Sequence, residues 1–274
     1  MEIGVFSRTY ETDDLQETFS RMTHDGIYHT QFNFSNVGLQ SLPEEIDDST
    51  LEMIHTASNR FHVNIDVLTG TFNMIDPDES ARARGIKQFS LQCRAARELG
   101  IPIVTLCTGS KNPESKWKWH DDNLKESSWT DLMNTTSQII QVAEDNHIIL
   151  GVETEASNII NTPERARKYL DEVGSPNLKI IMDGANLFHA DQVQKMRDVL
   201  DNAFDLLGKD IVTAHAKDLI FDGKVEFVAV GQGILDFPYY IMLLKKYGYN
   251  GPLTMHGLSE RQIPESYRYL KRLL

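Results

Sequence analysis

Residues 147–155 read HIILGVETE, and residues 177–187 read NLKIIMDGANL. In each stretch a short apolar run ends on one or two acidic residues. Residues 210–218, DIVTAHAKD, and residues 251–257, GPLTMHG, repeat the pattern with a histidine near the end. Short runs that are apolar almost throughout predict strands of a parallel sheet that is covered on both faces. The four stretches therefore indicate an α/β fold with ionisable groups at the strand ends.

Similar strands alternate with helix-like segments from one end of the 274-residue chain to the other. The expected strands are residues 2–7, 28–33, 61–70, 101–109, 147–155, 177–187, 210–218 and 251–256. The expected helices are residues 13–24, 49–60, 79–99, 127–146, 191–207, 236–247 and 261–273, with one more that Thr162 caps and Pro163 begins. Eight strand-then-helix units in a chain of this length predict a single (β/α)8 TIM barrel, with residues 1–274 as one domain. A Rossmann fold is disfavoured because no GxGxxG follows the first strand.

The composition argues against several classes of protein. The formal net charge of −13 gives an acidic surface that repels phosphate backbones, so we expect no nucleic-acid partner. No stretch approaches the roughly 18 apolar residues of a membrane-spanning helix, and the acidic N-terminus lacks the apolar core of a signal peptide. Cys93 and Cys107 do not form the CxxC pair of a metal site, so we expect two reduced, buried thiols. We expect a cytoplasmic protein with a small-molecule substrate and no membrane partner, and a homo-oligomer is compatible with the sequence.

Strand alternation places a set of ionisable side chains inside the barrel. Successive residues of a barrel strand face the interior and the helix layer in turn. If the apolar residues face the helices, the side chains left on the interior near the carboxyl ends of the strands are Glu153, Asp183, His215 and His256. The carboxyl end of a barrel is the end that carries catalytic residues. We therefore interpret these four positions as the functional site.

Two interpretations account for charged groups at such buried positions, because an unpaired charge there is costly. The first is a divalent metal ion held by Glu153, Asp183, His215 and His256. Carboxylate and imidazole ligands suit Mn²⁺, Mg²⁺, Co²⁺ or Zn²⁺, and the sequence does not choose among them. The second is a network of buried salt bridges around Lys217, with His215 as an ordinary core histidine. The four positions taken together favour the metal.

The stretches VETE, IIMDGANL, AHAKD and GPLTMHG resemble the motifs of the xylose isomerase-like barrel superfamily over essentially the whole chain. That superfamily includes sugar-phosphate isomerases and epimerases, ketose 3-epimerases, hydroxypyruvate isomerases and the endonuclease IV enzymes. The resemblance implies a divalent metal ion with Glu153, Asp183 and His215 as its first three ligands. The chain differs from the family pattern at three positions: His256 replaces the usual fourth glutamate, Asn186 replaces a histidine, and Ile159 replaces a substrate-contacting glutamate.

Other polar residues are candidates for contacts with the substrate. Glu155 shares the inward parity of Glu153 and is either a substrate contact or a partner of Lys217. Lys217 either holds a substrate oxygen or only neutralises carboxylates. Asn73 follows the third strand and either binds a hydroxyl or forms a turn. Trp119 and His120 belong to the loop KWKWH, which either stacks on a sugar or buries its own aromatic rings.

Three functions remain open from the sequence. The first is a metal-dependent isomerase or epimerase of a small polyhydroxy carbonyl compound, free or phosphorylated, that acts through an enediolate. Glu153 is then the base, and His256 is the acid or a further metal ligand. The second is a lyase or dehydratase, which would form the same enolate and then expel a hydroxyl. The third is a barrel that binds metal and sugar without turnover, which the histidine at position 256 would suit.

Overall fold

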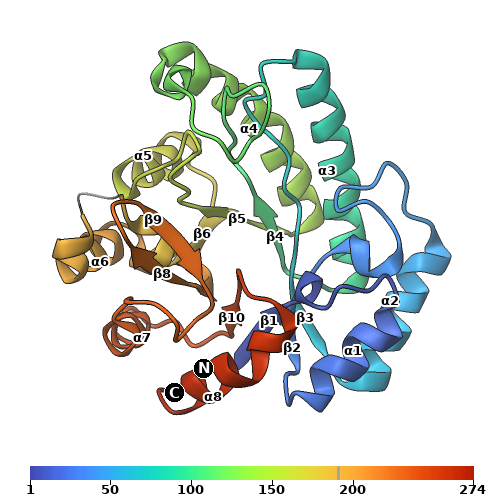
Figure 1. The fold of residues 1–274 in the computed structure, drawn as a ribbon. Helices are drawn as coiled ribbons and strands as arrows, with labels where there is room; N and C mark the ends of the chain where they lie inside the picture. Colours follow the sequence, from blue (N-terminus) through green and yellow to red (C-terminus); the bar gives the residue numbers. More distant parts are fainter. Residues whose placement is uncertain (190–191) are drawn as a thin grey trace.

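The computed structural model describes residues 1–189 and 192–274, and it confirms the predicted TIM barrel. Eight parallel strands close in the order β1-β10-β7-β6-β5-β4-β3-β2 (Figure 1). They are β1 (Ile3–Phe6), β2 (His29–Phe32), β3 (Asn64–Leu68), β4 (Ile103–Leu106), β5 (Ile149–Glu153), β6 (Leu178–Asp183), β7 (Ile211–Ala216) and β10 (Leu253–Met255). The register pairs Asp183 with His215 across β6 and β7, and Thr254 with His215 across β10 and β7. The carboxyl ends of these three strands therefore meet at one place.

Helices form the outer layer of the barrel (Figure 1). They are α1 (Leu15–His24), α2 (Asp48–Phe61), α3 (Glu79–Leu99), α4 (Glu126–Asn146), α5 (Pro163–Val173), α6 (Met196–Leu207), α7 (Phe237–Lys246) and α8 (Ile263–Lys271). The side chain of Thr162 accepts the backbone amide of Arg165, as expected of the cap of α5. Within the described ranges, no helix combines the length and the apolar character needed to span a bilayer.

Two segments differ from the sequence prediction. The helix expected from residue 191 begins at Met196 in the described part of the chain, after a short 3-10 turn over Val193–Lys195, and residue 191 itself lies outside the described residues. No helix or strand was predicted for residues 219–235, which follow β7. The segment after β7 contains an antiparallel hairpin of β8 (Asp218–Phe221) and β9 (Val225–Val228). Its turn has Gly223 in the left-handed region, with φ of 74°, which is a common hairpin arrangement.

The barrel interior below the strand ends is filled by side chains. A Cβ atom at Gly151 would lie 2.7 Å from Cγ1 of Ile181, so the absence of a side chain on β5 makes room for Ile181 on β6. Ile181 and Ile103 are both buried. The interior is thus a packed core rather than a pore. Because this core supports the strand ends from below, the polar groups at the carboxyl ends are held on rigid elements.

Candidate functional site

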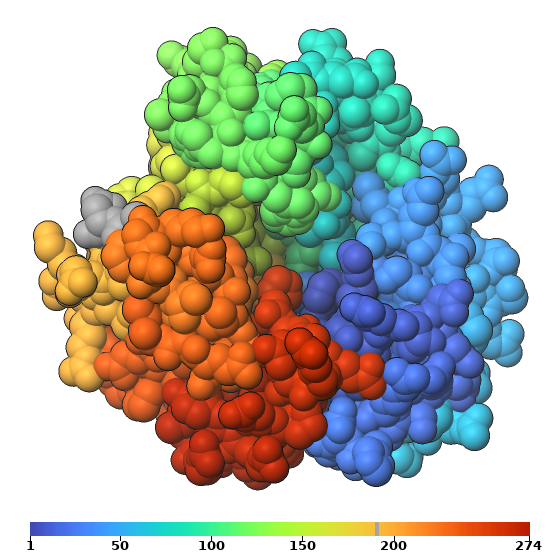
Figure 2. All heavy atoms as spheres, in the orientation of Figure 1, coloured from blue at the N-terminus to red at the C-terminus, as the bar shows by residue number. Residues whose placement is uncertain are grey.

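A cavity of about 400 Å³ opens at the carboxyl ends of the barrel strands. In Figure 2 the face of the molecule is hollowed near its centre, between the green loop after β4 and the orange hairpin of β8 and β9. The ionisable side chains that line the cavity are Arg8, Glu153, Glu155, His215, Lys217 and His256. The strand ends therefore carry a cavity that has ionisable side chains in its wall.

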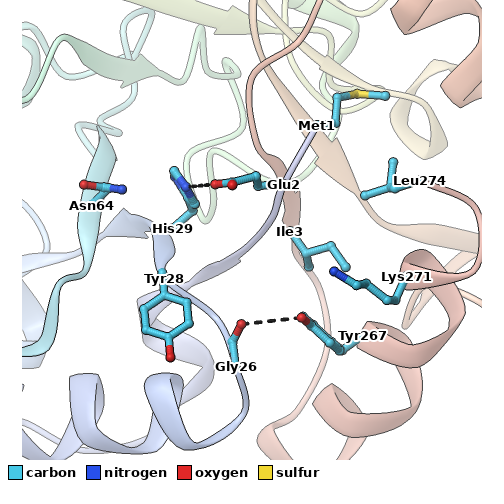
Figure 3. Close-up of a pocket in the computed structure, with 10 residues that line it drawn as sticks. All are labelled: Met1, Glu2, Ile3, Gly26, Tyr28, His29, Asn64, Tyr267, Lys271 and Leu274. Carbon is cyan, nitrogen blue, oxygen red and sulfur yellow. Dashed lines mark hydrogen bonds and ion pairs between the residues drawn. The ribbon is translucent and has the colours of Figure 1, made fainter.

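A larger cavity, of about 630 Å³, lies at the opposite, amino-terminal end of the barrel (Figure 3). There the imidazole of His29 lies between the carboxylates of Glu2 and Asp66, with Nδ1 at 2.9 Å from Oδ2 of Asp66. All buried side-chain polar atoms that lack a hydrogen-bond partner in the described part of the chain lie elsewhere. The smaller cavity is therefore the better candidate for chemistry, because two histidines that line it, His215 and His256, each keep a buried ring nitrogen without a hydrogen-bond partner.

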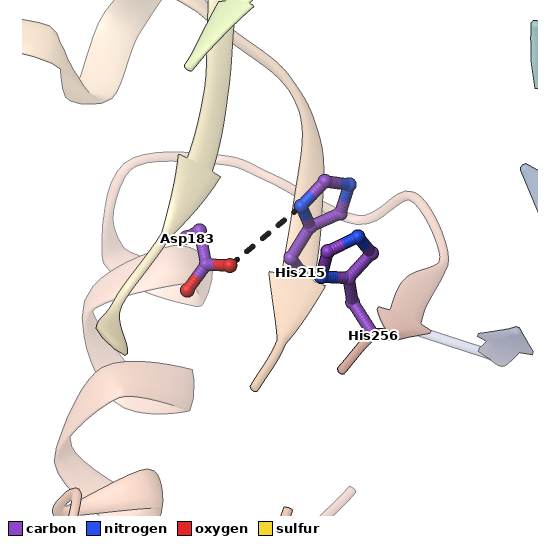
Figure 4. Close-up of side chains that lie close together, drawn as sticks. All are labelled: Asp183, His215 and His256. Atoms are coloured by element: carbon purple, nitrogen blue, oxygen red, sulfur yellow. Dashed lines mark ion pairs between the residues drawn. The ribbon is translucent and has the colours of Figure 1, made fainter. Parts of the chain in front are cut away.

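Asp183, His215 and His256 form a compact group of possible metal ligands. One ligand atom of each lies within 4.8 Å of the others. Figure 4 shows the carboxylate of Asp183 pointing toward the imidazole of His215, with His256 beside it. The two imidazoles stack with their centroids 5.1 Å apart, and the amide of His256 donates to the carbonyl of Ala216 at 3.2 Å. Strands β6 and β7 and the residue after β10 thus supply the group.

The ligand atoms of this group have no hydrogen-bond partner. They are Oδ2 of Asp183, Nδ1 of His215 and Nδ1 of His256, all buried. Buried polar atoms are almost always hydrogen-bonded, so three of them without a hydrogen-bond partner at one place form a candidate cation site. Two imidazoles and a carboxylate are a donor set that divalent transition metals accept. The residues present therefore fit a metal ion.

Gln31 orients one of the imidazoles. Nε2 of His215 lies 2.9 Å from Oε1 of Gln31, while the amide nitrogen of Gln31 donates to Oγ1 of Thr69 at 3.2 Å. With its amide oriented in this way, Gln31 accepts the Nε2 proton of His215. Nδ1 then points toward Asp183 and Glu153, at 3.8 and 3.5 Å from their nearest oxygens. Sequence reasoning missed Gln31, and the only signal was a polar residue near the end of the second strand.

Asn186 links the remaining carboxylates to Lys217. Its amide nitrogen donates to Oε1 of Glu153 at 2.6 Å and to Oε2 of Glu155 at 3.1 Å. Its amide oxygen accepts from Nζ of Lys217, which also lies 3.2 Å from Oδ2 of Asp183. The salt-bridge network around Lys217 that the sequence left open is therefore present. It does not satisfy the two imidazoles, so it accompanies the group of possible metal ligands and does not replace it.

The pKa values of the two imidazoles are shifted in opposite directions. Burial lowers the pKa of His215, but the charges of Glu153 and Asp183 outweigh burial and raise it to about 9. Burial, together with the charges of His215 and Lys217, lowers the pKa of His256 to about 3. Without metal at neutral pH, His215 is a cation and His256 is neutral. His256 is thus ready to ligate, whereas His215 must first release a proton.

The acidic groups of the site also differ from one another. Burial would raise the pKa of Asp183, but the charge of Lys217 and then the interactions with His215 hold it well below its usual range. Burial raises the pKa of Glu155, against the opposing charge of Lys217. Asp183 is therefore ionised, and Glu155 holds a proton more readily than a free glutamate does.

Three predicted substrate contacts do not line the cavity. Asn73 forms a loop contact, donating to the carbonyl of Ser110 at 2.8 Å and accepting its amide at 3.0 Å. The indole of Trp119 donates to Asp121 at 3.0 Å, and Nδ1 of His120 accepts the amide of Asp122 at 3.2 Å. Their roles in substrate binding stay predictions. The aromatic residues that do line the cavity are Phe6, Trp117 and Phe227.

The sequence profile of the xylose isomerase-like TIM barrel family matches residues 19–273. The chain belongs to this family. Among curated proteins, it is 25% identical over 194 residues to the L-ribulose-5-phosphate 3-epimerase UlaE of Shigella flexneri. That match covers 69% of this chain and 61% of the relative, so it falls short of two thirds of the relative's length.

Solved structures of this family share the fold. A D-tagatose 3-epimerase-like protein superposes with a TM-score of 0.76 at 19% identity, covering 100% of this chain and 97% of the other. The IOLI protein, whose structure holds a zinc atom, superposes with a TM-score of 0.74 at 18% identity, covering 99% and 96%. At such identities the likeness establishes the fold, and the chemistry must be argued from the side chains.

Proposed function

We propose that the protein is a metal-dependent sugar isomerase or epimerase that acts on a polyhydroxy carbonyl compound through an enediolate. The observation that carries the proposal is the compact group of buried candidate ligand atoms of Asp183, His215 and His256, which lie beside Glu153 at the cavity. The relatives of the chain include a sugar-phosphate epimerase, which supports the same class of reaction. A lyase or dehydratase would begin with the same proton abstraction.

Asp183, His215 and His256 would hold the metal, and Glu153 is the candidate for a fourth ligand. When bound, a divalent ion would polarise the substrate carbonyl and make the neighbouring C–H bond more acidic. Because two of the donors are imidazoles, Mn²⁺, Co²⁺ or Zn²⁺ suits the site better than Mg²⁺. The sequence analysis also offered His256 as the catalytic acid. A pKa of about 3 leaves its imidazole without a proton to donate near pH 7, so we assign it to the metal.

Proton transfer falls to the two glutamates. The side chain of Glu153 is 21% exposed, so it reaches the cavity, and the amide of Asn186 orients its Oε1. We assign Glu153 as the base that removes the proton from carbon. Glu155 lines the same cavity, and burial raises its pKa, so it is suited to return a proton. Lys217, which keeps its charge among three carboxylates, offsets the negative charge of the pair.

The metal assignment is tested by elemental analysis of the purified protein after incubation with Mn²⁺, Co²⁺ or Zn²⁺ and removal of the excess. We expect about one ion per chain in the wild type and in His55→Ala, which removes an exposed imidazole on α2. Asp183→Asn should lose the ion. If the wild type stays metal-free with every ion, the ligand assignment is wrong and the site is a salt-bridge network.

Turnover is tested by exchange of a substrate C–H proton with deuterated solvent, using a panel of free and phosphorylated ketoses. We expect Glu153→Gln to slow exchange by about 10²- to 10⁴-fold, the usual contribution of a general base. A protein that binds metal and catalyses no exchange with any member of the panel would support the alternative of a barrel that binds without turnover.

A further inference from the structure

Two large aromatic side chains are exposed at the mouth of the cavity. The exposed fraction is 53% for Trp117, in the loop after β4, and 43% for Phe227, on β9. Both also line the cavity of about 400 Å³. Exposed apolar surface around a cavity that also holds a few polar groups is typical of a ligand-binding site.

The loop that carries Trp117 is held on both sides of that residue. The amide of Asn158 donates to the carbonyl of Lys116 at 3.0 Å, and the hydroxyl of Ser110 donates to the carbonyl of Lys118 at 2.6 Å. Asn158 and Ser110 are buried, with 1% and 0% exposure. The backbone that carries the exposed indole is thus held by buried polar residues on each side.

The hairpin that carries Phe227 is fixed in a similar way. Residue Phe227 pairs with Leu219 on β8. The buried carboxylate of Asp218, at the base of the hairpin, accepts four backbone amides at 2.8 to 3.0 Å, from Leu219, Gly231, Gly233 and Leu235. The ring of Phe227 lies with its centroid 4.0 Å from Nζ of Lys217. Phe227 therefore lies directly beside the ionisable groups around Lys217.

Most of the cations around this aromatic mouth are engaged by other groups of the protein. Nζ of Lys116 donates to the carbonyl of Thr71 at 2.9 Å, and Nζ of Lys118 pairs with Glu114 at 2.7 Å. Lys217 is buried and engaged by the carboxylate of Asp183 and by Asn186. Among the described residues that line the cavity, Arg8 is left as the exposed cation. Phosphate groups are normally bound by several cationic or backbone donors, so the mouth is poorly suited to a phosphorylated end.

We propose that the substrate is a glycoside whose reacting sugar unit carries a carbonyl group, so that this unit reacts over Glu153 while a second, uncharged ring packs on Trp117 and Phe227. The proposal rests on the isomerase or epimerase function proposed above and names its substrate class. The volume agrees, because cavities of about 300 Å³ and more accommodate ligands larger than one sugar ring. Rings with an apolar face, from a second sugar or an aromatic aglycone, share the chemistry that both side chains recognise.

The test measures equilibrium binding to the Mn²⁺-loaded protein by calorimetry, with phenyl β-glucoside, glucose, ribulose and ribulose 5-phosphate as probes. We expect phenyl β-glucoside to bind more tightly than glucose. Trp117→Ala and Phe227→Ala should each weaken its binding by about 2- to 12-fold, the usual range for an aromatic contact, and should leave glucose binding unchanged. The matched control is Phe221→Ala, which removes a 37% exposed ring on the same hairpin that lies outside the cavity.

Two results would overturn the glycoside proposal. One is unchanged binding of phenyl β-glucoside in both aromatic variants. The other is tighter binding of ribulose 5-phosphate than of the glucoside, abolished by Arg8→Gln, which would make Arg8 a phosphate anchor. Because binding is measured without turnover, failure of the general function is seen separately, as absence of solvent exchange in a protein that still binds the glucoside through Trp117 and Phe227.

Discussion

At the scale of single residues, His256 stands where the resemblance described in the sequence analysis implied a glutamate. Its imidazole stacks on that of His215 and lies 5.4 Å from the ring of Phe6, so its plane is set by neighbours on β7 and β1. A glutamate at this position would add a charge beside Asp183. The neutral imidazole instead supplies a ligand without charge, which leaves Lys217 able to balance the carboxylates that remain. The donor set therefore remains suited to a divalent ion.

At the same scale, Gln31 sets the tautomer of His215, and Gln31→Leu tests this role. Without the amide oxygen, the imidazole loses the partner that directs Nδ1 toward Asp183. Because groups that orient a metal ligand typically contribute about 10- to 100-fold in affinity, we expect a loss of that size for Mn²⁺ or Zn²⁺. The measurement is a competition titration against a chelator, with Gln31→Glu as the variant that keeps an acceptor. Equal affinities in wild type and Gln31→Leu would contradict the assignment.

At the scale of elements, the structure adds to the barrel the parts that shape the cavity mouth. The helices and strands of the barrel follow from apolar runs, caps and glycine turns that are local in the sequence. The hairpin of β8 and β9 is held instead by one buried carboxylate. Asp218 accepts hydrogen bonds from backbone amides at both ends of the segment between residues 218 and 235. Such an anchor is not visible in a pattern of apolar residues.

Asp218→Asn measures the strength of this anchor. Oδ2 of Asp218 accepts the amides of Gly231 and Gly233, and the NH₂ of an asparagine in the same place would face two donors. We expect a loss of about 1–3 kcal/mol in the free energy of unfolding, because buried donors are left unpaired. Urea unfolding gives this value, and hydrogen exchange should show the loss at residues 219–235. Asp222→Asn, at the exposed hairpin turn, is the matched control. An unchanged exchange pattern in Asp218→Asn would rule the anchor out.

At the scale of the whole molecule, we expect metal binding and proton binding to compete at His215. Without metal, the pKa of His215 is raised to about 9, so this imidazole is protonated at neutral pH and contributes stability that is lost as pH rises through that value. A metal ion needs the neutral imidazole, so it displaces the proton. Metal affinity therefore falls as pH falls below 9, by up to about tenfold for each unit. His256, with a pKa of about 3, adds nothing to this dependence near neutrality.

Thermal unfolding measures this linkage. At a free Mn²⁺ concentration of about 100 times the dissociation constant, the metal should stabilise the wild type by about 2.7 kcal/mol. At the same Mn²⁺ concentration, this stabilisation should be smaller at about pH 6 than at about pH 8.5, because at the lower pH more of the binding free energy is used to displace a proton from His215. Asp183→Asn should show no gain at either pH. A rise in Tm with Mn²⁺ that does not depend on pH would mean that His215 is not a ligand.

The barrel itself was predictable from sequence because its determinants are local. Alternation within each strand places Glu153, Asp183 and His215 inward, and a cap such as Thr162 fixes a helix start with contacts three residues away. Strand ends in a parallel barrel always meet at one rim, so the shared end of these residues also followed. The assignment of residues 1–274 to one domain and the roles of the site residues remain predictions of the same reasoning.

The tertiary structure decided the features that depend on contacts between distant segments. Gln31 and His215 lie 184 residues apart in the chain, and their hydrogen bond exists only because the barrel closes β1 and β2 onto β10 and β7. The tertiary structure also decided that Trp117, and not Trp119, lines the cavity. The loop that carries both residues is held by hydrogen bonds from the buried side chains of Asn158 and Ser110. Sequence periodicity reports which face a side chain occupies within its own element. It carries no information on which distant partner satisfies a buried polar atom, and that pairing determines the site.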